Sequence, residues 1–388
     1  MTAARTATPS TARAINDRLA LDLMIEHGPL TASQLKTLTG LSRPTVADLV
    51  ERLCQAGLIH LVGEAGERQR GPNARLYGIV PDRAYIAGLD VRLDAVEVAV
   101  ADLTGRITAT GTLAIPPHAD AMHPVADVLA LLDDTARRGG AETLHTVAVG
   151  APGLVDPASG NLISDTCSLP GWHALVVAAL RERGGVILEN EANLAGIAEQ
   201  RLGAARGLDT FVLVWLGQGV GACVMLDGRL RRGASGGSGE LGFLPVPGTE
   251  HLPSRTNSKG GFHTLVSGAA IEELAARHGF SGTAEESLRA AVAGESAAGA
   301  ALLDELAGRI VLGVSALAVI LDPGCVVLGG EHGRVGGVGL AERVEVRLAA
   351  ATPLRTRVLA GMVPGNAILG GAVLIGLDAV RDDLFGCP

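Results

Sequence analysis

Residues 31–53 read TASQLKTLTGLSRPTVADLVERL, and this stretch decides the fold of the N-terminal part of the chain. Thr31, followed three residues later by Gln34, fits a capping box, which is the start signal of a helix. Ser42 is a typical N-cap for a further helix, with Pro44 in its first turn. The expected buried face of this further helix consists of Val46, Leu49, Val50 and Leu53. The pattern predicts two helices joined by a tight turn.

The flanking residues complete a winged helix. Upstream, Ile15, Leu19 and Leu23 recur every four positions, which predicts an amphipathic helix over residues 14–27. Downstream, two strand patterns enclose a polar tip that is rich in Gly and Arg. These strand patterns cover residues 58–62 and 75–80. Three helices followed by a β-hairpin are typical of winged helix-turn-helix domains, which bind DNA.

Several polar side chains of the third helix lie off its apolar stripe, and the N-terminal residues of such a helix reach base edges. We therefore expect the DNA-reading set to include Ser42, Arg43, Thr45, Asp48 and Arg52. Arg43 is the first candidate for guanine, because a guanidinium can pair with both major-groove acceptors of that base. Asp48 weakens the attraction to phosphate, although a carboxylate can accept a hydrogen bond from a cytosine amine.

The tip of the hairpin carries Arg68 and Arg70, with Arg75 behind it. Arginine side chains on a wing suit insertion into a narrow minor groove. The alternative is a charged loop that only contacts solvent. Because the hairpin follows directly after a helix-turn-helix, the docking geometry of that motif favours contact with DNA.

Length and charge restrict the rest of the chain. The 388 residues are too many for one hydrophobic core, and 47% hydrophobic against 19% charged residues exclude a disordered chain. The formal net charge is −9, yet residues 1–80 carry nine basic and seven acidic side chains. We therefore expect DNA to meet only this N-terminal segment.

The cysteines and the apolar stretches point to a cytoplasmic protein without a membrane partner. The five cysteines are scattered singly, without the paired spacing of zinc or disulfide sites. The longest apolar stretch, residues 310–321, is too short to cross a bilayer. Residues 1–14 lack the apolar run of a signal peptide.

Beyond Pro81 the strand patterns occur twice in a similar arrangement, and both copies turn on an Asp-containing hairpin that ends in Gly. The first copy covers residues 85–91, 95–101 and 106–115, and the second covers residues 210–216, 221–226 and 229–232. Helical stretches alternate with further strands between and after them. The pattern predicts an α/β body of two lobes that arose by internal duplication.

Three motifs of this body occur in one order: Gly150-Ala-Pro-Gly-Leu-Val-Asp156, Glu189-Asn-Glu-Ala-Asn-Leu194 and Arg232-Gly-Ala-Ser-Gly-Gly-Ser-Gly-Glu240. Together with Leu41-Ser-Arg-Pro-Thr-Val46 they resemble the ROK family of repressors and sugar kinases, over nearly the whole chain from about Ile15. The resemblance implies an actin-like fold with a sugar cleft between its lobes. In members with a winged helix it also implies control of transcription by sugars.

The resemblance and the patterns together divide the chain into four parts. We expect a flexible N-terminus over residues 1–13 and a DNA-binding domain over residues 14–80. The first lobe is expected over residues 83–192 together with a C-terminal helix, residues 370–388, and the second lobe over residues 193–369.

The chemistry of the kinase members is damaged in this chain. Those members deprotonate the sugar with the Asp of a Glu-Asn-Asp-Ala-Asn motif, where this chain has Glu191. They follow a strand-end Asp with Gly-Gly-Thr, whereas Asp90 is followed by Val91-Arg-Leu-Asp94, whose bulk and second carboxylate would block and repel phosphate. The glycine loop at residues 217–221 is retained, but such glycines also serve tight turns. We expect no catalysis and no cofactor.

The metal site of the family is absent from the sequence as well. Its His and three Cys align with Phe243, Ser254, Thr256 and Gly261, none of which binds zinc as an imidazole or a thiolate. His251 and His263 lie nearby, but two histidines without a third ligand more often make ordinary hydrogen bonds. We expect no metal.

The resemblance also places the effector site. The sugar-contacting positions carry over to Asn190, Glu191 and Glu240, while a further His and Glu have become Phe243 and His263, so we expect a site with changed specificity. The alternative is that Asn190 and Glu240 are structural, capping a helix or closing the Gly-rich loop. Trp172 either stacks on a sugar or belongs to the core.

The sequence therefore predicts a transcriptional regulator of carbohydrate genes, in the first instance a repressor, whose DNA binding is controlled by a sugar in a non-catalytic cleft. A homodimer or tetramer on two-fold operator DNA is expected. Two alternatives are an active ATP-dependent sugar kinase with an appended DNA-binding domain, and a regulator gated by a protein partner. The sequence does not identify the effector, the operator or the direction of the response.

Overall fold

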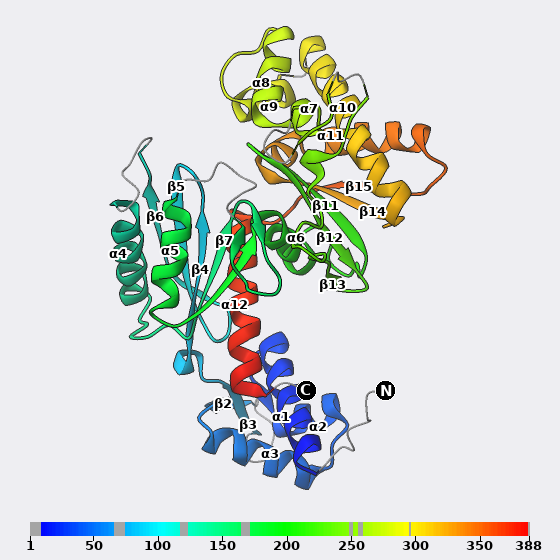
Figure 1. Ribbon diagram of the computed structural model, residues 1–388. Helices are drawn as coiled ribbons and strands as arrows, with labels where there is room; N and C mark the ends of the chain where they lie inside the picture. The colour runs from blue at the N-terminus through cyan, green and yellow to red at the C-terminus, as the bar shows by residue number, and fades with distance from the viewer. Residues whose placement is uncertain are drawn as a thin grey trace.

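The computed structural model describes residues 9–65, 74–116, 123–163, 171–247, 251–254, 259–294 and 296–386. It has a small helical domain next to the C-terminal end of a long helix, and two α/β lobes beside the other end of that helix (Figure 1). Arg68 and Arg70 lie outside the described residues.

The small domain is a winged helix. Its elements are α1 (Pro9–His27), β1 (Leu30–Thr31), α2 (Ala32–Thr39), α3 (Arg43–Gln55), β2 (Ile59–Ala65) and β3 (Ala74–Ile79), and its sheet has the order β1-β3-β2. The capping box of Thr31 and Gln34 is present, Gly40 ends α2 in a left-handed conformation with φ 71°, and the Ser42 side chain caps α3. The start signals of both helices were correctly predicted from the sequence.

The apolar stripe of α1 is not its buried face. Ile15 and Leu19 are 44% and 40% exposed, and the side chains that α1 buries are Ala20, Leu21 and Met24. The reason is that α1 is covered from two sides. It contacts α2 and α3 of its own domain, and it also contacts the helix at the C-terminal end of the chain. Periodicity locates an amphipathic helix but does not say which neighbours will cover it.

The two lobes repeat one sheet topology, as the predicted duplication requires. The first sheet consists of β4 (Tyr85–Val91), β5 (Ala95–Asp102), β6 (Ile107–Ala114), β7 (Thr146–Ala151) and β10 (Gly185–Asn190), in the order β10-β7-β4-β5-β6. The second consists of β11 (Phe211–Leu216), β12 (Val220–Leu226), β13 (Arg229–Leu230), β14 (Cys325–Gly329) and β15 (Arg357–Ala360), in the order β13-β12-β11-β14-β15. In each sheet an antiparallel meander is extended by two parallel strands.

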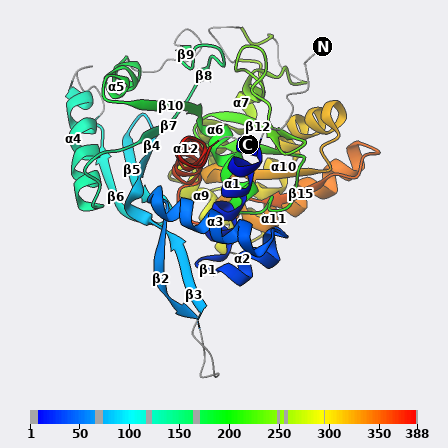
Figure 2. The same ribbon diagram turned by 90° about the horizontal axis from the view of Figure 1, so that it is seen from below.

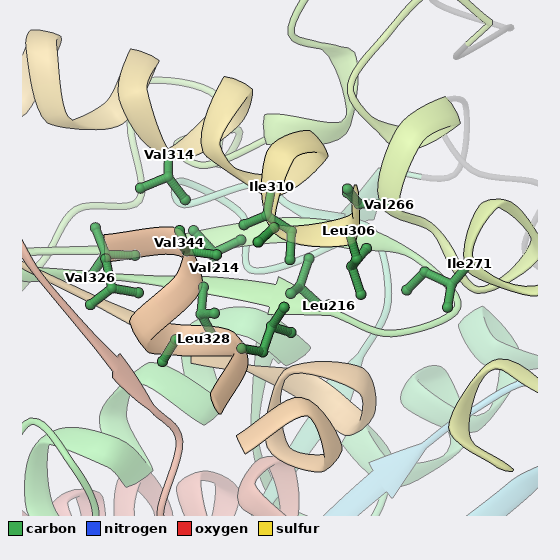
Figure 3. Packing of buried hydrophobic residues seen from close by; sticks show 14 of the residues in the cluster. Val214, Leu216, Val266, Ile271, Leu306, Ile310, Val314, Val326, Leu328 and Val344 are labelled. Atoms are coloured by element: carbon green, nitrogen blue, oxygen red, sulfur yellow. The ribbon is translucent and has the colours of Figure 1, made fainter. Parts of the chain in front are cut away.

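Helices cover these sheets. The first lobe carries α4 (His123–Arg138) and α5 (Trp172–Arg181), a small hairpin of β8 (Leu154–Val155) and β9 (Leu162–Ile163), and a 3₁₀ turn at Pro81–Arg83. The second lobe carries a 3₁₀ turn at Leu241–Phe243, α7 (His263–Val266), α8 (Gly268–Arg277), α9 (Ala284–Ala293), α10 (Ala297–Leu321) and α11 (Gly330–Ala351). Figure 3 shows the core of this lobe, in which Ile310 of α10 and Val344 of α11 meet Val214 of β11.

Two helices join the lobes to each other and to the winged helix. α6 (Glu191–Leu202) follows directly after β10 and packs on β12, β11 and the last helix, α12 (Ala367–Phe385). α12 packs on β4 of the first sheet, and its C-terminal end reaches α1 (Figure 1). One apolar cluster accordingly runs from Leu21 of α1 to Leu377 and Phe385 of α12. No helix in the described ranges is both long and apolar enough to span a membrane.

Candidate functional site

The N-terminal turn of α3 presents an unpaired cation. Arg43 is exposed and makes no hydrogen bond or ion pair with any described residue. Its neighbours are occupied, because the Ser42 hydroxyl accepts a bond from the Thr45 backbone N–H at 3.4 Å and lies 2.8 Å from the Thr45 hydroxyl. The Ser42 hydroxyl therefore caps the helix and also binds the Thr45 hydroxyl, whereas the Arg43 side chain of this turn has no partner among the described residues and is free to reach a base edge.

Farther along α3, the two charged residues of the expected DNA-reading set bind each other. Arg52 forms an ion pair with Asp48, and its Nη2 also lies 2.5 Å from Oδ1 of Asp17 on α1. The pair with Asp17 holds α3 against α1, while the pair with Asp48 lies within α3. A role in positioning α3 explains these contacts of Arg52 directly.

The β2–β3 hairpin projects away from the body (Figure 2). Arg75 lies on β3, where it is exposed. Because the tip of the hairpin lies outside the described residues, the roles of Arg68 and Arg70 stay predictions from the sequence.

The second set of expected site residues begins where β10 ends at Asn190 and α6 starts at Glu191, and the carboxyl ends of strands are the usual position of ligand sites in α/β folds. Glu191 is the first residue of α6, and its carboxylate has no hydrogen-bond partner among the described residues. Burial, together with the negative charges of Asp90, Glu331 and Glu240, raises the pKa of Glu191 to about 8. At neutral pH this carboxyl group holds its proton and can donate a hydrogen bond as well as accept one.

Glu240 stands at the end of the Gly-rich loop that precedes the 3₁₀ turn at Leu241–Phe243, close enough to Glu191 for its charge to raise the pKa of that residue. Its carboxylate is half-buried, has no partner in the described part of the chain, and has a pKa raised by burial. The loop approaches β12 so closely that a Cβ on Gly239, whose φ is +90°, would lie 2.0 Å from the Ala222 carbonyl oxygen. Glu240 is therefore held in place by its backbone while its side chain stays available.

Asn190, in contrast, already makes three side-chain hydrogen bonds within the fold. Its Oδ1 accepts from the backbone N–H groups of Ala192 and Asn193 at 2.9 and 3.3 Å, and its Nδ2 donates to the Gly153 carbonyl at 2.9 Å. These bonds match the alternative in which Asn190 caps a helix. A role for Asn190 in binding an effector stays a prediction.

The position of the first phosphate loop holds a salt-bridge cluster. Arg92 lies between three carboxylates: it pairs with Glu97, its Nε is 3.4 Å from Oδ2 of Asp90, and its Nη1 is 3.9 Å from Oε1 of Glu331. Asp90 is 1% exposed, and burial raises its pKa to about 6. The expected block to phosphate thus comes from Arg92 and its partners, whereas the expected second carboxylate, Asp94, has no part in this cluster.

The retained glycine loop meets the same cluster. A Cβ on Gly217 would lie 2.6 Å from Oε2 of Glu331, so the Glu331 carboxylate packs directly against the loop. A phosphate approaching the backbone N–H groups here would meet that carboxylate at contact distance, where like charges repel strongly. The described residues do not fit a nucleotide triphosphate.

Three of the four positions that align with the zinc site of the family are described, and Thr256 lies outside the described residues. Phe243, Ser254 and Gly261 supply neither imidazole nor thiolate, and no cluster of three His, Cys, Asp or Glu side chains suited to a metal occurs in the described ranges. The loop is closed by backbone bonds, since Phe262 N–H donates to the Leu244 carbonyl at 2.8 Å. The residues present do not fit zinc.

His263 and Trp172, two further positions expected from the sequence, lie in different surroundings. His263 begins α7 at this loop, is half-buried, and has a pKa lowered by burial, so its imidazole is neutral at pH 7. Trp172 is 3% exposed and belongs to the core of the first lobe, with its ring centroid 3.9 Å from that of His173. The core alternative therefore accounts for Trp172.

Sequence reasoning missed two residues of the cleft. Glu331 and Asn366 help to line a pocket of about 270 Å³ between the lobes, beside Arg92 and Trp215. Among the described residues, Glu191, Glu240 and His263 do not line this pocket, and Glu191 is connected to it through its electrostatic interaction with Glu331 and Arg92. The glycine pair at the end of β14, just before Glu331, was the available signal, because a Cβ on Gly330 would lie 2.3 Å from the Leu216 carbonyl oxygen. Asn366 gave no signal beyond its helix-capping residue type.

Known proteins resemble this chain over both of its parts. The MarR family model matches residues 15–70. The xylose repressor of Bacillus subtilis is 25% identical over 60% of this chain and 60% of its own length, and the DNA-binding transcriptional dual regulator NagC of Escherichia coli is 26% identical over 67% and 64%. The bifunctional enzyme NanE/NanK of Brucella suis is 40% identical, but over 50% of this chain and 35% of that protein.

Solved structures resemble the fold. A ROK family transcriptional regulator described as a homologue of the E. coli MLC protein has a TM-score of 0.76 at 19% identity, covering 96% of this chain and 98% of that one. A ROK hexokinase from Thermus thermophilus has a TM-score of 0.63 at 25% identity, covering 77% of this chain and 99% of that one. The ROK family model itself matches residues 86–376, most of the chain, and the chain therefore belongs to the ROK family.

Proposed function

We propose that this protein is a sugar-responsive regulator of transcription, which binds operator DNA through α3 and the wing and binds a saccharide in a non-catalytic cleft. The observation that carries the proposal is a combination of two features of one chain. Arg43 at the start of the reading helix is unpaired among the described residues, and Arg92 forms a salt-bridge cluster at the position of the first phosphate loop. The names of relatives, a xylose repressor and NagC, support the same function.

The cleft suits a polyol better than an anion. The unpaired side chains of Glu191 and Glu240 offer two carboxyl groups, of which the first is protonated at neutral pH, and His263 adds a neutral imidazole. Such a set can donate to and accept from sugar hydroxyls in fixed directions. We propose that these three residues bind the effector, with repression as the default response.

A DNA-binding assay tests the proposal. Full-length protein is titrated against fluorescent fragments of its own upstream region, and the titration is repeated with a panel of neutral monosaccharides, amino sugars and oligosaccharides. We expect nanomolar binding that weakens steeply with salt and that one class of sugar changes at least tenfold. Failure to bind any upstream fragment at low salt would refute the DNA-binding part.

A thermal-shift screen with the same sugars tests the cleft separately. A saccharide that binds the folded state raises the melting temperature by mass action, and Glu240→Gln should reduce the shift. DNA binding without any stabilising saccharide would favour a regulator gated by a protein partner.

The second candidate is an active sugar kinase with an appended DNA-binding domain. Glu191 at the base position and the 40% identity to part of NanE/NanK favour it. ATP turnover over the sugar panel decides the matter, and we expect none above background. Robust phosphorylation that Glu191→Gln abolishes would establish this candidate.

We further propose that the regulator acts in the cytoplasm as a homodimer or tetramer, because one winged helix makes too few contacts for the usual operator affinity. Size-exclusion chromatography coupled to light scattering measures the mass of the oligomer directly. A monomer that still binds DNA tightly would contradict this part of the proposal.

A further inference from the structure

α12 connects the cleft to the winged helix, and one side chain fixes its N-terminal end. Asn366 caps the helix, since its Oδ1 accepts from the backbone N–H groups of Ile368 and Leu369 at 3.0 and 3.1 Å. The other half of the same amide points at Asp90, since Nδ2 donates to Oδ2 of that buried carboxylate at 2.7 Å. Asp90 in turn lies 3.4 Å from Nε of Arg92, which lines the pocket between the lobes, so the start of α12 depends on a buried carboxylate that is one side chain away from the pocket.

The segment that leads into α12 is held from the second lobe as well. The backbone N–H groups of Met362 and Val363 donate to Oε1 of Glu199 at 2.8 and 3.0 Å, and Arg334 of α11 donates to the Gly365 carbonyl. The ion pair of Arg92 with Glu331 joins the two lobes beside it. A change in the angle between the lobes must therefore be felt at the start of α12.

The body of α12 is built to move as one piece. Its 19 residues span about 28 Å. It packs so closely on β4 and on α6 that the contacts require glycine. A Cβ on Gly88 of β4 would lie 2.9 Å from Cγ2 of Val373, and a Cβ on Gly371 of α12 would lie 2.1 Å from the Leu194 carbonyl oxygen of α6. Contacts this tight resist bending within the helix.

The C-terminal end of α12 is fastened to α1 through Arg18. Nη1 of Arg18 lies 2.7 Å from Oδ1 of Asp382 and donates to the Gly386 carbonyl at 3.4 Å, and the guanidinium lies 5.7 Å from the centroid of the Phe385 ring. Phe385 itself is 5% exposed, in the apolar cluster that includes the winged-helix core. Figures 1 and 2 both show this end of α12 beside α1.

We propose that α12 transmits the state of the Asp90 carboxylate to the DNA-reading head, with Asn366 and Arg18 as positioning residues at its two ends. The inference rests on the proposed function and adds its route of regulation. A ligand in the pocket that draws Arg92 away from Asp90, or a proton that binds Asp90, changes the acceptor of the Asn366 amide and releases the start of α12. The resulting shift reaches α1 through Arg18 and then α3 through the pair of Asp17 and Arg52.

Hydrogen–deuterium exchange on the full-length protein tests this route without DNA or sugar. Asn366→Asp keeps an oxygen for the helix cap but loses the amide donor and places a second carboxylate against Asp90. We expect exchange several-fold faster in peptides from residues 15–27 of α1, although these lie at the far end of α12. The double variant Asp90→Asn with Asn366→Asp reverses the donor and acceptor, and it should restore slow exchange in α1.

Two controls separate transmission from general loosening. Asn161→Asp makes the same substitution on an exposed part of the first lobe and should leave α1 unchanged. Residues 302–318 of α10, in the core of the second lobe, serve as the internal reference and should stay slow in every variant. Arg18→Met should speed exchange in α1 while residues 85–91 of β4 keep the wild-type rate.

The outcomes are distinct. Faster exchange confined to residues 361–372 and 85–91 in Asn366→Asp, with α1 at its wild-type rate, would overturn the proposal. So would a rise shared equally by α10, or a failure of the reversed pair to restore α1. Because the exchange rates require no operator, failure of the upstream DNA to bind would count against the proposed function and would leave this test intact.

Discussion

Arg52 on the reading helix binds Asp17 on α1, with Nη2 and Oδ1 2.5 Å apart and the two side chains 30% and 20% exposed. The pair fixes the angle between the two helices, and it explains why a cation in the expected DNA-reading set is directed inward. Arg52→Met and Asp17→Asn should each lower the free energy of unfolding of the protein by about 1 kcal/mol. Urea titrations of the two single variants and the double variant should show non-additive losses.

The same variants separate positioning from direct reading. If Arg52 only positions α3, Asp17→Asn weakens DNA binding by about as much as Arg52→Met. A large loss for Arg52→Met combined with wild-type affinity for Asp17→Asn would mean that Arg52 contacts the DNA itself.

Arg43 should show the opposite behaviour. Its side chain is exposed and unpaired in the described structure, so Arg43→Ala leaves thermal stability within about 0.5 kcal/mol of the wild type. If it reads guanine, the substitution lowers operator affinity about ten- to a hundredfold and relaxes the preference at one base position. Binding titrations on the wild-type site and on single-base variants measure both effects, with the exposed Arg137→Ala as the control.

The winged helix shows what a sequence can and cannot specify. Thr31 with Gln34, and Ser42 with Pro44, are local signals, because a cap satisfies backbone groups within three residues of itself. The buried face of α1 was not predictable in this way. It depends on α12, which lies more than three hundred residues away in the chain and binds Arg18 through Asp382.

The residues of the cleft likewise fall into those that the sequence could indicate and those that it could not. Glu191 and Glu240 could be proposed from the sequence because short motifs carry them, and the missing Gly-Gly-Thr after Asp90 marked the position of the first phosphate loop. The sequence pointed to bulk and to a second carboxylate there, whereas the structure shows a salt-bridge cluster around Arg92. Glu331 and Asn366 were missed, since their importance arises from contacts with residues of the first lobe. The structure also separated Asn190 from Glu240, which the sequence could not, by showing which side chain is already satisfied.

Glu191 should give the protein a pH-dependent stability. The pKa of about 8 in the folded state lies above the ordinary value of 4.5, so the folded protein holds a proton that the unfolded chain has released. The contribution of Glu191 to stability is therefore fully present below about pH 4.5 and is lost as the pH rises to about 8, by an amount on the order of 4 kcal/mol. Asp90, with a pKa of about 6, acts in the same direction below pH 6.

Glu191→Gln removes this dependence, because an amide resembles the neutral acid. Melting temperatures of the variant and the wild type should agree near pH 5, and the variant should melt several degrees higher at pH 8.5. Equal slopes of melting temperature against pH in the two proteins would show that Glu191 is ionised in the folded state.

Arg92 should be needed for stability above neutral pH. It lies between Asp90, Glu97 and Glu331, and replacing it with Met leaves three carboxylates close together without a counter-charge. Arg92→Met should lower the melting temperature by several degrees at pH 8 and by less at pH 5, where Asp90 is protonated. Adding Glu331→Gln, which removes one of the carboxylates, should recover part of the loss at pH 8. If Arg92→Met were as stable as the wild type and gained ATP binding in a calorimetric titration, Arg92 would instead be the main obstacle to the nucleotide. We expect that no ATP binds, because the carboxylates that remain in the variant repel phosphate.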